Sequence, residues 1–258
     1  MDLQSQRRFS GLTRLFGTAG AQHIRTSHVA VVGIGGVGSW AAEALARSGV
    51  ACLTLIDMDH VAESNINRQV HAVESTLGQA KVVAMRDRIA SIHPECVVNQ
   101  IDEFVTPANW PCILPAGVDA VIDACDQLQA KTAMAAWALN NPLLFVCVGA
   151  AGGKQLAHKV DIDDLSNTTH DPLLAQLRYR LRKHHGALRA KKMGLTCVYS
   201  KEAVQRPQVA APDVAGECPV ADNSLNCSGY GSVVSVTATF GHCAAGWVLS
   251  ELALPRRG

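Results

Sequence analysis

The chain has 258 residues, a length that suits one large domain or two small ones, and one domain is the simpler prediction. Hydrophobic residues make up 48% of it, charged residues 17%, and the formal net charge is +1, so the overall charge indicates no partner. The first residues, MDLQSQRRFSG, lack the apolar run of a signal peptide, and the nine cysteines form no CxxC pair. We therefore expect a cytoplasmic enzyme with free thiols and no zinc site.

Predicted strands and helices alternate through the first 150 residues. Short apolar runs rich in branched side chains predict strands at HVAVVGI, ACLTLID, CVVNQI, DAVIDAC and LLFVCVGA. Helical patterns lie between strands at SWAAEALARSG, QAKVVAMRDRIASIH and QAKTAMAAWALN. This order predicts an α/β, Rossmann-like fold, a mostly parallel sheet with helices on both faces. The nucleotide-binding core would cover about residues 24–150 of a single domain that extends over residues 1–258.

The second half of the chain, about residues 151–258, is less regular and would carry the substrate and dimer regions. One helix is predicted within DDLSNTTHDPLLAQLRYRLRKHHG, followed by polar loops to about residue 226. The last apolar segment, residues 231–254, has three interpretations: a final helix buried in the core or in a dimer interface, membrane association through this segment or the adjacent PRRG, or a mixture of strand and helix. We expect the buried helix.

The first predicted strand leads into a glycine-rich loop, VVGIGGVGSWAAEAL, which contains the pattern GxGxxG. Gly33, Gly35 and Gly38 form the pattern, and Gly36 adds a further bare position. Bare backbone amides at the start of a helix form a site for a phosphate. Asp57, at the end of the next strand, has the spacing of a carboxylate that accepts hydrogen bonds from a ribose. These features fit NAD, FAD and ATP equally.

Three charged residues favour ATP. Arg68 and Lys81 supply positive charge, and Asp126 lies at the carboxyl end of a strand, where open α/β sheets bind ligands. Displacing pyrophosphate from ATP develops negative charge, which the two cations would neutralise while Asp126 holds a magnesium ion. Each residue also has an ordinary interpretation: a surface ion pair for Arg68, a solvated first-turn lysine for Lys81, and a helix N-cap for Asp126.

Five spaced motifs, GxGGxG, xDxD, SNxxRQ, GxxK and DxxD, follow one another in the first 150 residues. Together they resemble the ubiquitin-activating enzyme superfamily, in its bacterial adenylating branch of molybdopterin and thiamine biosynthesis. The resemblance implies that a carboxylate attacks the α-phosphate of ATP and that pyrophosphate leaves. It also implies nucleotide contacts at Gly33, Gly35, Gly36, Gly38, Asp57, Asp59, Asn65, Arg68, Gln69 and Lys81, and a metal contact at Asp126.

The same resemblance implies a homodimer with two shared sites. In the superfamily an arginine near the N-terminus enters the active site of the other subunit, and RRFSGLTRLFG offers Arg8 and Arg14, of which we favour Arg14. The alternative is a solvated cationic helix. Members that activate sulfur carriers have CxxC pairs for zinc and a reactive cysteine. This chain has no CxxC. Cys227 in LNCSGYGS, near a glycine-rich turn, is the candidate for a reactive thiol, and the alternative is that it has only a structural role.

Longer matches run nearly from end to end. RFSGLTRLFG, LIDMDHV, NRQVHA, IHPEC, EFVTP, GAAGG, DPLLAQLR and SVTATFG resemble the family of tRNA threonylcarbamoyladenosine dehydratases. The resemblance implies that ATP activates the carboxylate of threonylcarbamoyladenosine next to the anticodon of tRNA, and that the carbamoyl group then closes a ring with net loss of water. Because the adenylate is attacked from within its own molecule, no enzyme thiol is needed.

Two alternative functions stay open. One is adenylation of the C-terminus of a small sulfur-carrier protein, which the absent CxxC pairs disfavour. The other is a nicotinamide-dependent oxidoreductase, which Arg68, Lys81 and Asp126 together disfavour. A sulfur-relay protein is a candidate partner in cells.

A basic segment, LRYRLRKHHGALRAKKMG at residues 177–194, contains seven arginine and lysine residues and no acidic residue. In a nearly neutral chain, this local charge predicts a surface that contacts tRNA phosphates, and its tyrosine would stack on an unpaired base. The alternative is a solvated helix face followed by a loop. The expected tRNA contacts are Arg178, Tyr179, Arg182, Lys183, Lys191 and Lys192.

Overall fold

A seven-stranded sheet forms the centre of the computed structural model, which describes residues 3–205 and 230–255. The strand order is β3-β2-β1-β4-β5-β7-β6. All neighbouring strands are parallel except β6 and β7, which are antiparallel. The predicted Rossmann-like, mostly parallel sheet is therefore confirmed. The strands are β1 (His28–Val32), β2 (Cys52–Ile56), β3 (Val97–Ile101), β4 (Ala120–Asp123), β5 (Leu144–Val148), β6 (Val160–Asp164) and β7 (Thr196–Ser200).

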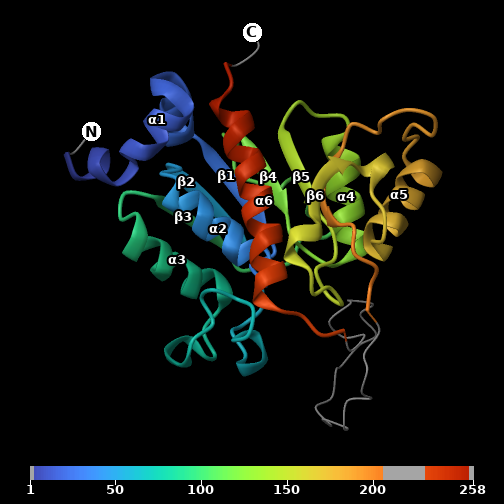
Figure 1. Cartoon of the computed structure of the whole chain (residues 1–258), viewed down its shortest axis with the longest axis horizontal. Helices are drawn as coiled ribbons and strands as arrows, with labels where there is room; N and C mark the ends of the chain where they lie inside the picture. The colour runs from blue at the N-terminus through green and yellow to red at the C-terminus, as the bar shows by residue number, and fades with distance from the viewer. Residues whose placement is uncertain (1–2, 206–229, 256–258) are drawn as a thin grey trace.

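Helices cover both faces of the sheet (Figure 1). One apolar core joins the sheet to α1 (Leu3–Thr26), α2 (Gly38–Arg47), α3 (Lys81–Ile92) and α6 (Val234–Ala253). A second core joins the opposite face to α4 (Leu128–Ala138) and α5 (Pro172–His184). Because successive side chains of a strand point to opposite faces, Val29 and Val31 of β1 enter the first core, whereas Ala30 and Val32 enter the second.

The last apolar segment of the chain forms one continuous helix, α6, which packs against α1 and α2 (Figure 1). Val236, Phe240 and Ala244 are fully buried and follow one another at the four-residue spacing of a helix face. Gly241 allows the close approach to α2, since a Cβ atom there would lie 2.5 Å from the carbonyl oxygen of Val37. The interpretation as a buried helix is confirmed, and the mixture of strand and helix is wrong.

No helix in residues 3–205 and 230–255 combines the length and the apolar character needed to cross a bilayer. The arginines of PRRG, on which the membrane interpretation also rested, lie outside the described residues, as does Cys227.

Two strands of the second half, β6 and β7, were not predicted from the sequence. The sequence of β6 is VDIDD, and all five residues are only partly buried because this strand forms the edge of the sheet. Its three aspartates therefore replace the apolar run that identified the central strands. The predicted helix of this region is α5, which begins at Pro172. Asp171 is its N-cap, because the Asp171 side chain accepts a hydrogen bond from the Leu174 amide.

Candidate active site

A cavity of about 430 Å³ lies at the carboxyl ends of β2, β1, β4 and β5. Its size is usual for a small-molecule site, and the strand order reverses there, between β1 and β4, as in other open α/β sheets that bind ligands. Nearly all predicted nucleotide contacts line it, with Gly38 as the exception. The predicted residues in the lining are Gly33, Gly35, Gly36, Asp57, Asp59, Asn65, Arg68, Gln69, Lys81 and Asp126.

The glycine-rich loop between β1 and α2 is packed too tightly for side chains at two positions. Gly33 has a φ of 84°, and a Cβ atom there would lie 2.9 Å from the amide nitrogen of Cys125. A Cβ atom at Gly38 would lie 1.8 Å from the carbonyl oxygen of Gly33. Gly38 therefore lets the loop close on itself without lining the cavity. Gly35 and Gly36 present bare backbone to the cavity.

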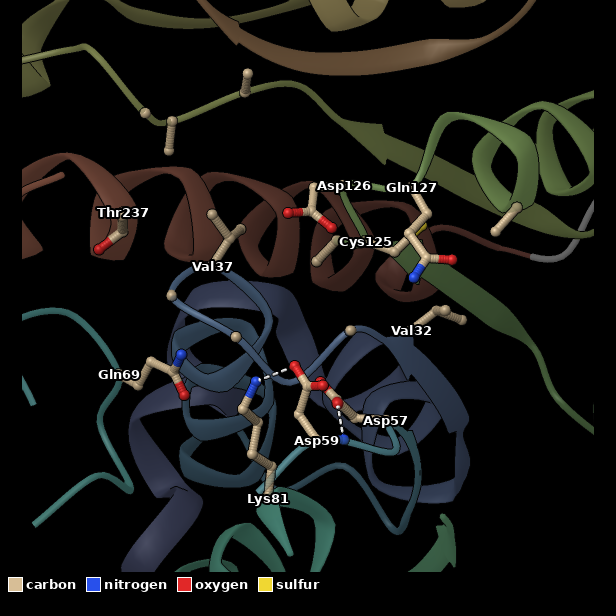
Figure 2. A pocket seen from close by; sticks show the side chains of 18 of the residues that line it. Val32, Val37, Asp57, Asp59, Gln69, Lys81, Cys125, Asp126, Gln127 and Thr237 are labelled. Atoms are coloured by element: carbon tan, nitrogen blue, oxygen red, sulfur yellow. Dashed lines mark hydrogen bonds and ion pairs between the residues drawn. The ribbon is translucent and has the colours of Figure 1, made fainter. Parts of the chain in front are cut away.

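Asp57 connects the end of β2 to the glycine-rich loop. Its Oδ2 atom accepts a hydrogen bond from the amide of Ile34 at 2.6 Å, and its Oδ1 atom accepts one from the amide of Asp59 at 2.8 Å. Burial raises the pKa of the Asp57 carboxyl, while Lys81 and the two amides act in the opposite direction. The side chain predicted to contact the ribose thus also fixes the loop that is predicted to approach the phosphates (Figure 2).

Lys81, the first residue of α3, is 5% exposed and reaches the cavity. Its Nζ atom forms an ion pair with Asp59 Oδ2 at 2.6 Å (Figure 2). The interpretation of Lys81 as a solvated lysine is therefore wrong. A buried ammonium with one carboxylate partner retains further donors for an anionic ligand, because the group has three N–H bonds.

Arg68 lines the cavity from the irregular segment between β2 and α3. Its Nη1 atom donates to the carbonyl oxygen of Ser64 at 2.6 Å and to Asn67 Oδ1 at 3.0 Å. Its own carbonyl oxygen accepts a hydrogen bond from Trp40 Nε1 of α2 at 2.9 Å. The side chain is partly buried and forms no ion pair within the described residues, so the structure does not support a surface ion pair.

Asn65 and Gln69 flank Arg68 and are both buried. The Oδ1 atom of Asn65 accepts from the amide of Ala62 at 3.1 Å and closes the short turn that precedes Arg68. Gln69 Oε1 is buried without a hydrogen-bond partner among the described atoms. Because an unpaired buried amide oxygen is costly, a hydroxyl or amine donor from a ligand in this cavity would satisfy it.

Asp126 lies on the loop between β4 and α4 and lines the cavity near the glycine-rich loop (Figure 2). The N-cap of α4 is Gln127, without a side-chain cap, so the N-cap interpretation of Asp126 is wrong. Below this loop, Lys131 Nζ contacts Asp123 Oδ2 at 2.8 Å and the carbonyl oxygen of Val148 at 2.9 Å. Burial disfavours the charge of Lys131, but the Asp123 carboxylate holds its pKa above the usual value. This pair connects the ends of β4 and β5.

A family model, the ThiF family, matches residues 9–250 of the chain. The chain belongs to the ThiF family. The tRNA threonylcarbamoyladenosine dehydratase of Escherichia coli strain K12 is 42% identical over 254 residues, and that of Haemophilus influenzae is 40% identical over 250 residues. Each comparison covers 96% of this chain and 94% of the relative. The resemblance inferred from the sequence is confirmed.

Solved structures of the Escherichia coli tRNA N6-threonylcarbamoyladenosine dehydratase are similar over the same extent. The complexes of that enzyme with ATP and with AMP both have a TM-score of 0.85 against this chain, at 40% and 41% sequence identity. Both comparisons cover 96% of this chain and 94% of the solved one.

The basic segment of this ThiF-family chain lies mainly on α5 and the following loop. Tyr179 is 61% exposed, and Lys183 Nζ lies 5.5 Å from the centre of its ring. Lys191 and Lys192 are exposed on the loop. Arg178 instead points inward, where its Nη1 atom donates to backbone carbonyl oxygens at 2.9 and 3.0 Å.

Two other predicted residues lie outside the cavity lining. Arg182 is partly buried, and its Nε atom has no partner within the described part of the chain. Arg14 is exposed on α1. Its predicted entry into the site of a second subunit concerns a contact between two chains, so it stays a prediction.

Sequence reasoning missed several parts of the cavity lining, among them residues 103–105 after β3. Thr237 of α6 lies beside the glycine-rich loop, with its Cγ2 atom 3.4 Å from a Cβ atom placed on Gly36. Residues 149–152, directly after β5, line the cavity together with Leu173 of α5. GAAGG was noted only as part of a resemblance, and no charged side chain marked it as a site.

Proposed function

We propose that the chain uses ATP to dehydrate threonylcarbamoyladenosine in tRNA by adenylating the threonine carboxylate. One observation carries the proposal: a single cavity gathers Arg68, Lys81 and Asp126 around the bare backbone of Gly35 and Gly36. The similarity along 96% of the chain to dehydratases, one of which was solved with ATP and with AMP, supports the choice of substrate.

In the proposed reaction the carboxylate attacks the α-phosphorus, a P–O bond forms, and pyrophosphate leaves with the electron pair of the broken bond. Lys81 and Arg68 hold the leaving group and neutralise its growing charge, while Gly35 and Gly36 let the backbone approach the phosphates. Asp57 and Gln69 contact the ribose hydroxyls. The carbamoyl group then attacks the acyl carbon, the bond from that carbon to the phosphate oxygen breaks, and AMP leaves with its electron pair. The carbamoyl N–H gives its proton to water as the ring closes.

We also propose that a magnesium ion binds in the cavity. The ion prefers one or two carboxylates together with substrate phosphates and water, and Asp126 provides a carboxylate on the lining. When bound there, magnesium would screen the phosphate charges. Proximity favours ring closure, since the attacking group and the activated carbonyl belong to one molecule.

We propose that α5 and its following loop contact the tRNA backbone through Lys183, Lys191 and Lys192, with Tyr179 stacking on a base. Arg178 supports this surface from inside through the contacts of its Nη1 atom to Leu165 and Thr168, and its direct contact with tRNA stays a prediction. Arg182, which is partly buried, stays a candidate contact.

Assembly and cellular context complete the proposal. We propose a cytoplasmic homodimer in which Arg14 of each subunit reaches the site of the other, which the mass of the protein in solution would check. A sulfur-relay protein stays a candidate partner. Membrane association through residues 231–254 has no support in the burial of α6.

Pyrophosphate release tests the proposal against the two alternatives. We expect release from ATP only when tRNA that contains threonylcarbamoyladenosine is present, and none with the unmodified transcript. Release driven by a diglycine-ended carrier protein would favour sulfur-carrier activation. Tight binding of NADH without any need for ATP would favour the oxidoreductase.

A further inference from the structure

One side of the cavity is lined by uncharged residues, to which the proposed function has so far assigned no part of the substrate. Along the sheet the strands run β2, β1, β4, β5, so residues 149–152 after β5 lie at the opposite end of the cavity from Asp59 and Lys81, which follow β2. We call residues 149–152 together with Leu173 the acceptor wall. None of its five residues carries a charged side chain.

Asp171 fixes the backbone of the acceptor wall. Its Oδ2 atom accepts from the amide of Ala150 at 2.8 Å, and its Oδ1 atom accepts from the amide of Leu174 at 2.9 Å. The residue is 5% exposed. A Cβ atom at Gly149 would lie 2.1 Å from Asp171 Oδ2, so the carboxylate reaches this backbone only because residue 149 is glycine.

Lys154 secures the same segment from the other end. The side chain is 2% exposed, and its Nζ atom donates to the carbonyl oxygen of His170 at 2.8 Å and to that of Glu202. Two buried, charged residues therefore attach the acceptor wall to the segment at the start of α5. The charged groups of Asp171 and Lys154 both form hydrogen bonds with backbone groups. This arrangement is expected where the position of the backbone itself matters.

The acceptor wall retains hydrogen-bond donors. The amide of Gly149 donates to the carbonyl oxygen of Val198 at 2.8 Å, and that of Ala150 donates to Asp171. Within the described residues the amides of Ala151 and Gly152 donate to no protein acceptor. Two neighbouring N–H groups at the edge of a cavity suit an oxygen of a carboxylate or of a urea carbonyl.

The geometry of phosphoryl transfer indicates that the attacking carboxylate binds at the acceptor wall. Attacking and leaving oxygens lie roughly in line in phosphoryl transfer, so the attacking carboxylate must approach from the side away from the pyrophosphate. Lys81, beyond β2 at the far end of the cavity, marks the pyrophosphate side. The acceptor wall is the opposite side.

We propose that the acceptor wall binds the threonylcarbamoyl group through the amides of Ala151 and Gly152, and that Asp171 is its positioning residue. The proposal rests on the proposed function. Leu173 packs against the base or the threonyl methyl group. Because α5 rises about 1.5 Å per residue, the ten residues from Leu173 to Lys183 span about 15 Å, so the tRNA backbone follows α5 from the cavity to the basic segment.

The first test is Asp171→Asn with the full chain and tRNA bearing threonylcarbamoyladenosine. The substitution replaces one accepting oxygen with an NH2 donor, and the two backbone amides use different oxygens, so either Ala150 or Leu174 loses its acceptor. We expect the KM for the modified tRNA to rise, or kcat to fall, by about tenfold to a hundredfold, with the Kd for ATP within about twofold of wild type. The exposed Asp87→Asn on α3 is the matched control.

The second test, Gly152→Ala, covers the case in which Asp171→Asn fails to fold. A Cβ atom at Gly152 meets only Tyr230 Cβ, at 3.6 Å, so the fold accommodates it while the methyl group narrows the cavity edge. We expect a raised KM for tRNA and an unchanged Kd for ATP. Gly246→Ala on α6, with nothing within 4 Å, is the control.

Two results would overturn the inference: a wild-type KM for tRNA in Gly152→Ala, or a loss in Asp171→Asn that affects ATP and tRNA equally together with a lowered Tm. Failure of the proposed function is a different result. In that case the wild-type protein itself releases no pyrophosphate with the modified tRNA.

Discussion

Two parts of the cavity lining are built from different chemical groups. The phosphate wall, which comprises Gly35, Gly36, Asp59, Arg68 and Lys81, combines charged side chains with bare glycine backbone. The acceptor wall, residues 149–152 and Leu173, offers backbone amides held from behind by buried charges. The proposed ligands account for the difference: phosphates would need their charge neutralised, whereas a neutral urea and a single carboxylate would need donors in fixed positions.

This comparison predicts separable defects. Variants of the phosphate wall should change ATP binding and the adenylation step, whereas variants of the acceptor wall should change the use of tRNA. The predictions that follow test that separation, beginning with the largest expected effect.

Asp126→Ala should remove metal-dependent turnover, because Asp126 lies between the two walls and offers the carboxylate for magnesium. We expect a loss of pyrophosphate release of about a thousandfold or more, with Tm unchanged. Titration of magnesium against rate is the measurement, and Asp102→Ala, exposed at the end of β3, is the control. Retention of the wild-type magnesium dependence would remove Asp126 from the site.

Arg68→Ala and Lys81→Ala should each slow adenylation by about a hundredfold to a thousandfold, because each removes a cation that stabilises the leaving pyrophosphate. The KM for tRNA should change little. Single-turnover formation of AMP measures the effect. The exposed Arg47→Ala provides the comparison for Arg68. A wild-type rate of adenylation in Arg68→Ala would refute the phosphate role of Arg68. It would also weaken the distinction between the phosphate wall and the acceptor wall.

Lys183→Ala should weaken tRNA binding a few-fold and reduce the slope of log K against log salt by up to about one, because one phosphate contact is lost. ATP binding should be unaffected. Binding of tRNA at several salt concentrations is the measurement, and Arg86→Ala on α3 is the control. An unchanged slope would move the tRNA path away from α5.

The pH dependence of stability should reveal His71, which is buried behind the phosphate wall. Burial, together with the charges of Lys81 and Arg88, lowers its pKa to about 4. The unfolded chain therefore takes up the proton near pH 6.5 and the folded protein only near pH 4, so stability is lost as the pH falls through this window. The loss should approach about 3 kcal/mol.

Urea unfolding of His71→Leu at pH 7 and pH 4.5 measures this contribution. The variant should lose less stability between the two pH values than wild type. His158→Leu, at an exposed position, should behave as wild type does. An equal loss in His71→Leu and wild type would show that His71 is not held neutral.

Sequence patterns predicted the phosphate wall because its chemistry is carried by residue type and spacing. Gly33 is required by its positive φ and Gly38 by a contact within the loop. Lys81 begins a recognisable helix, and Asp126 follows the end of a recognisable strand. Family resemblance added Asp59, Asn65 and Gln69, whose side chains alone indicate nothing specific.

The acceptor wall could not be predicted in the same way. Its donors belong to the backbone, and the Asp171 side chain that holds Ala150 comes from 21 residues further along the chain. Thr237 of α6 lies beside Gly36 of the glycine-rich loop, and its hydroxyl donates to the carbonyl oxygen of Arg68, 169 residues earlier in the chain. The β6 edge strand was missed because partial burial permits three aspartates. Contacts between segments distant in sequence leave no local pattern.

Nucleoside mass spectrometry of tRNA tests the central claim most directly. Transfer RNA that bears threonylcarbamoyladenosine would be incubated with the protein, ATP and magnesium, then digested and compared with a sample lacking ATP. The account predicts that the modified nucleoside loses the mass of one water only when ATP is present, and that AMP forms in equal amount. A nucleoside of unchanged mass in the presence of folded, ATP-binding protein would contradict it.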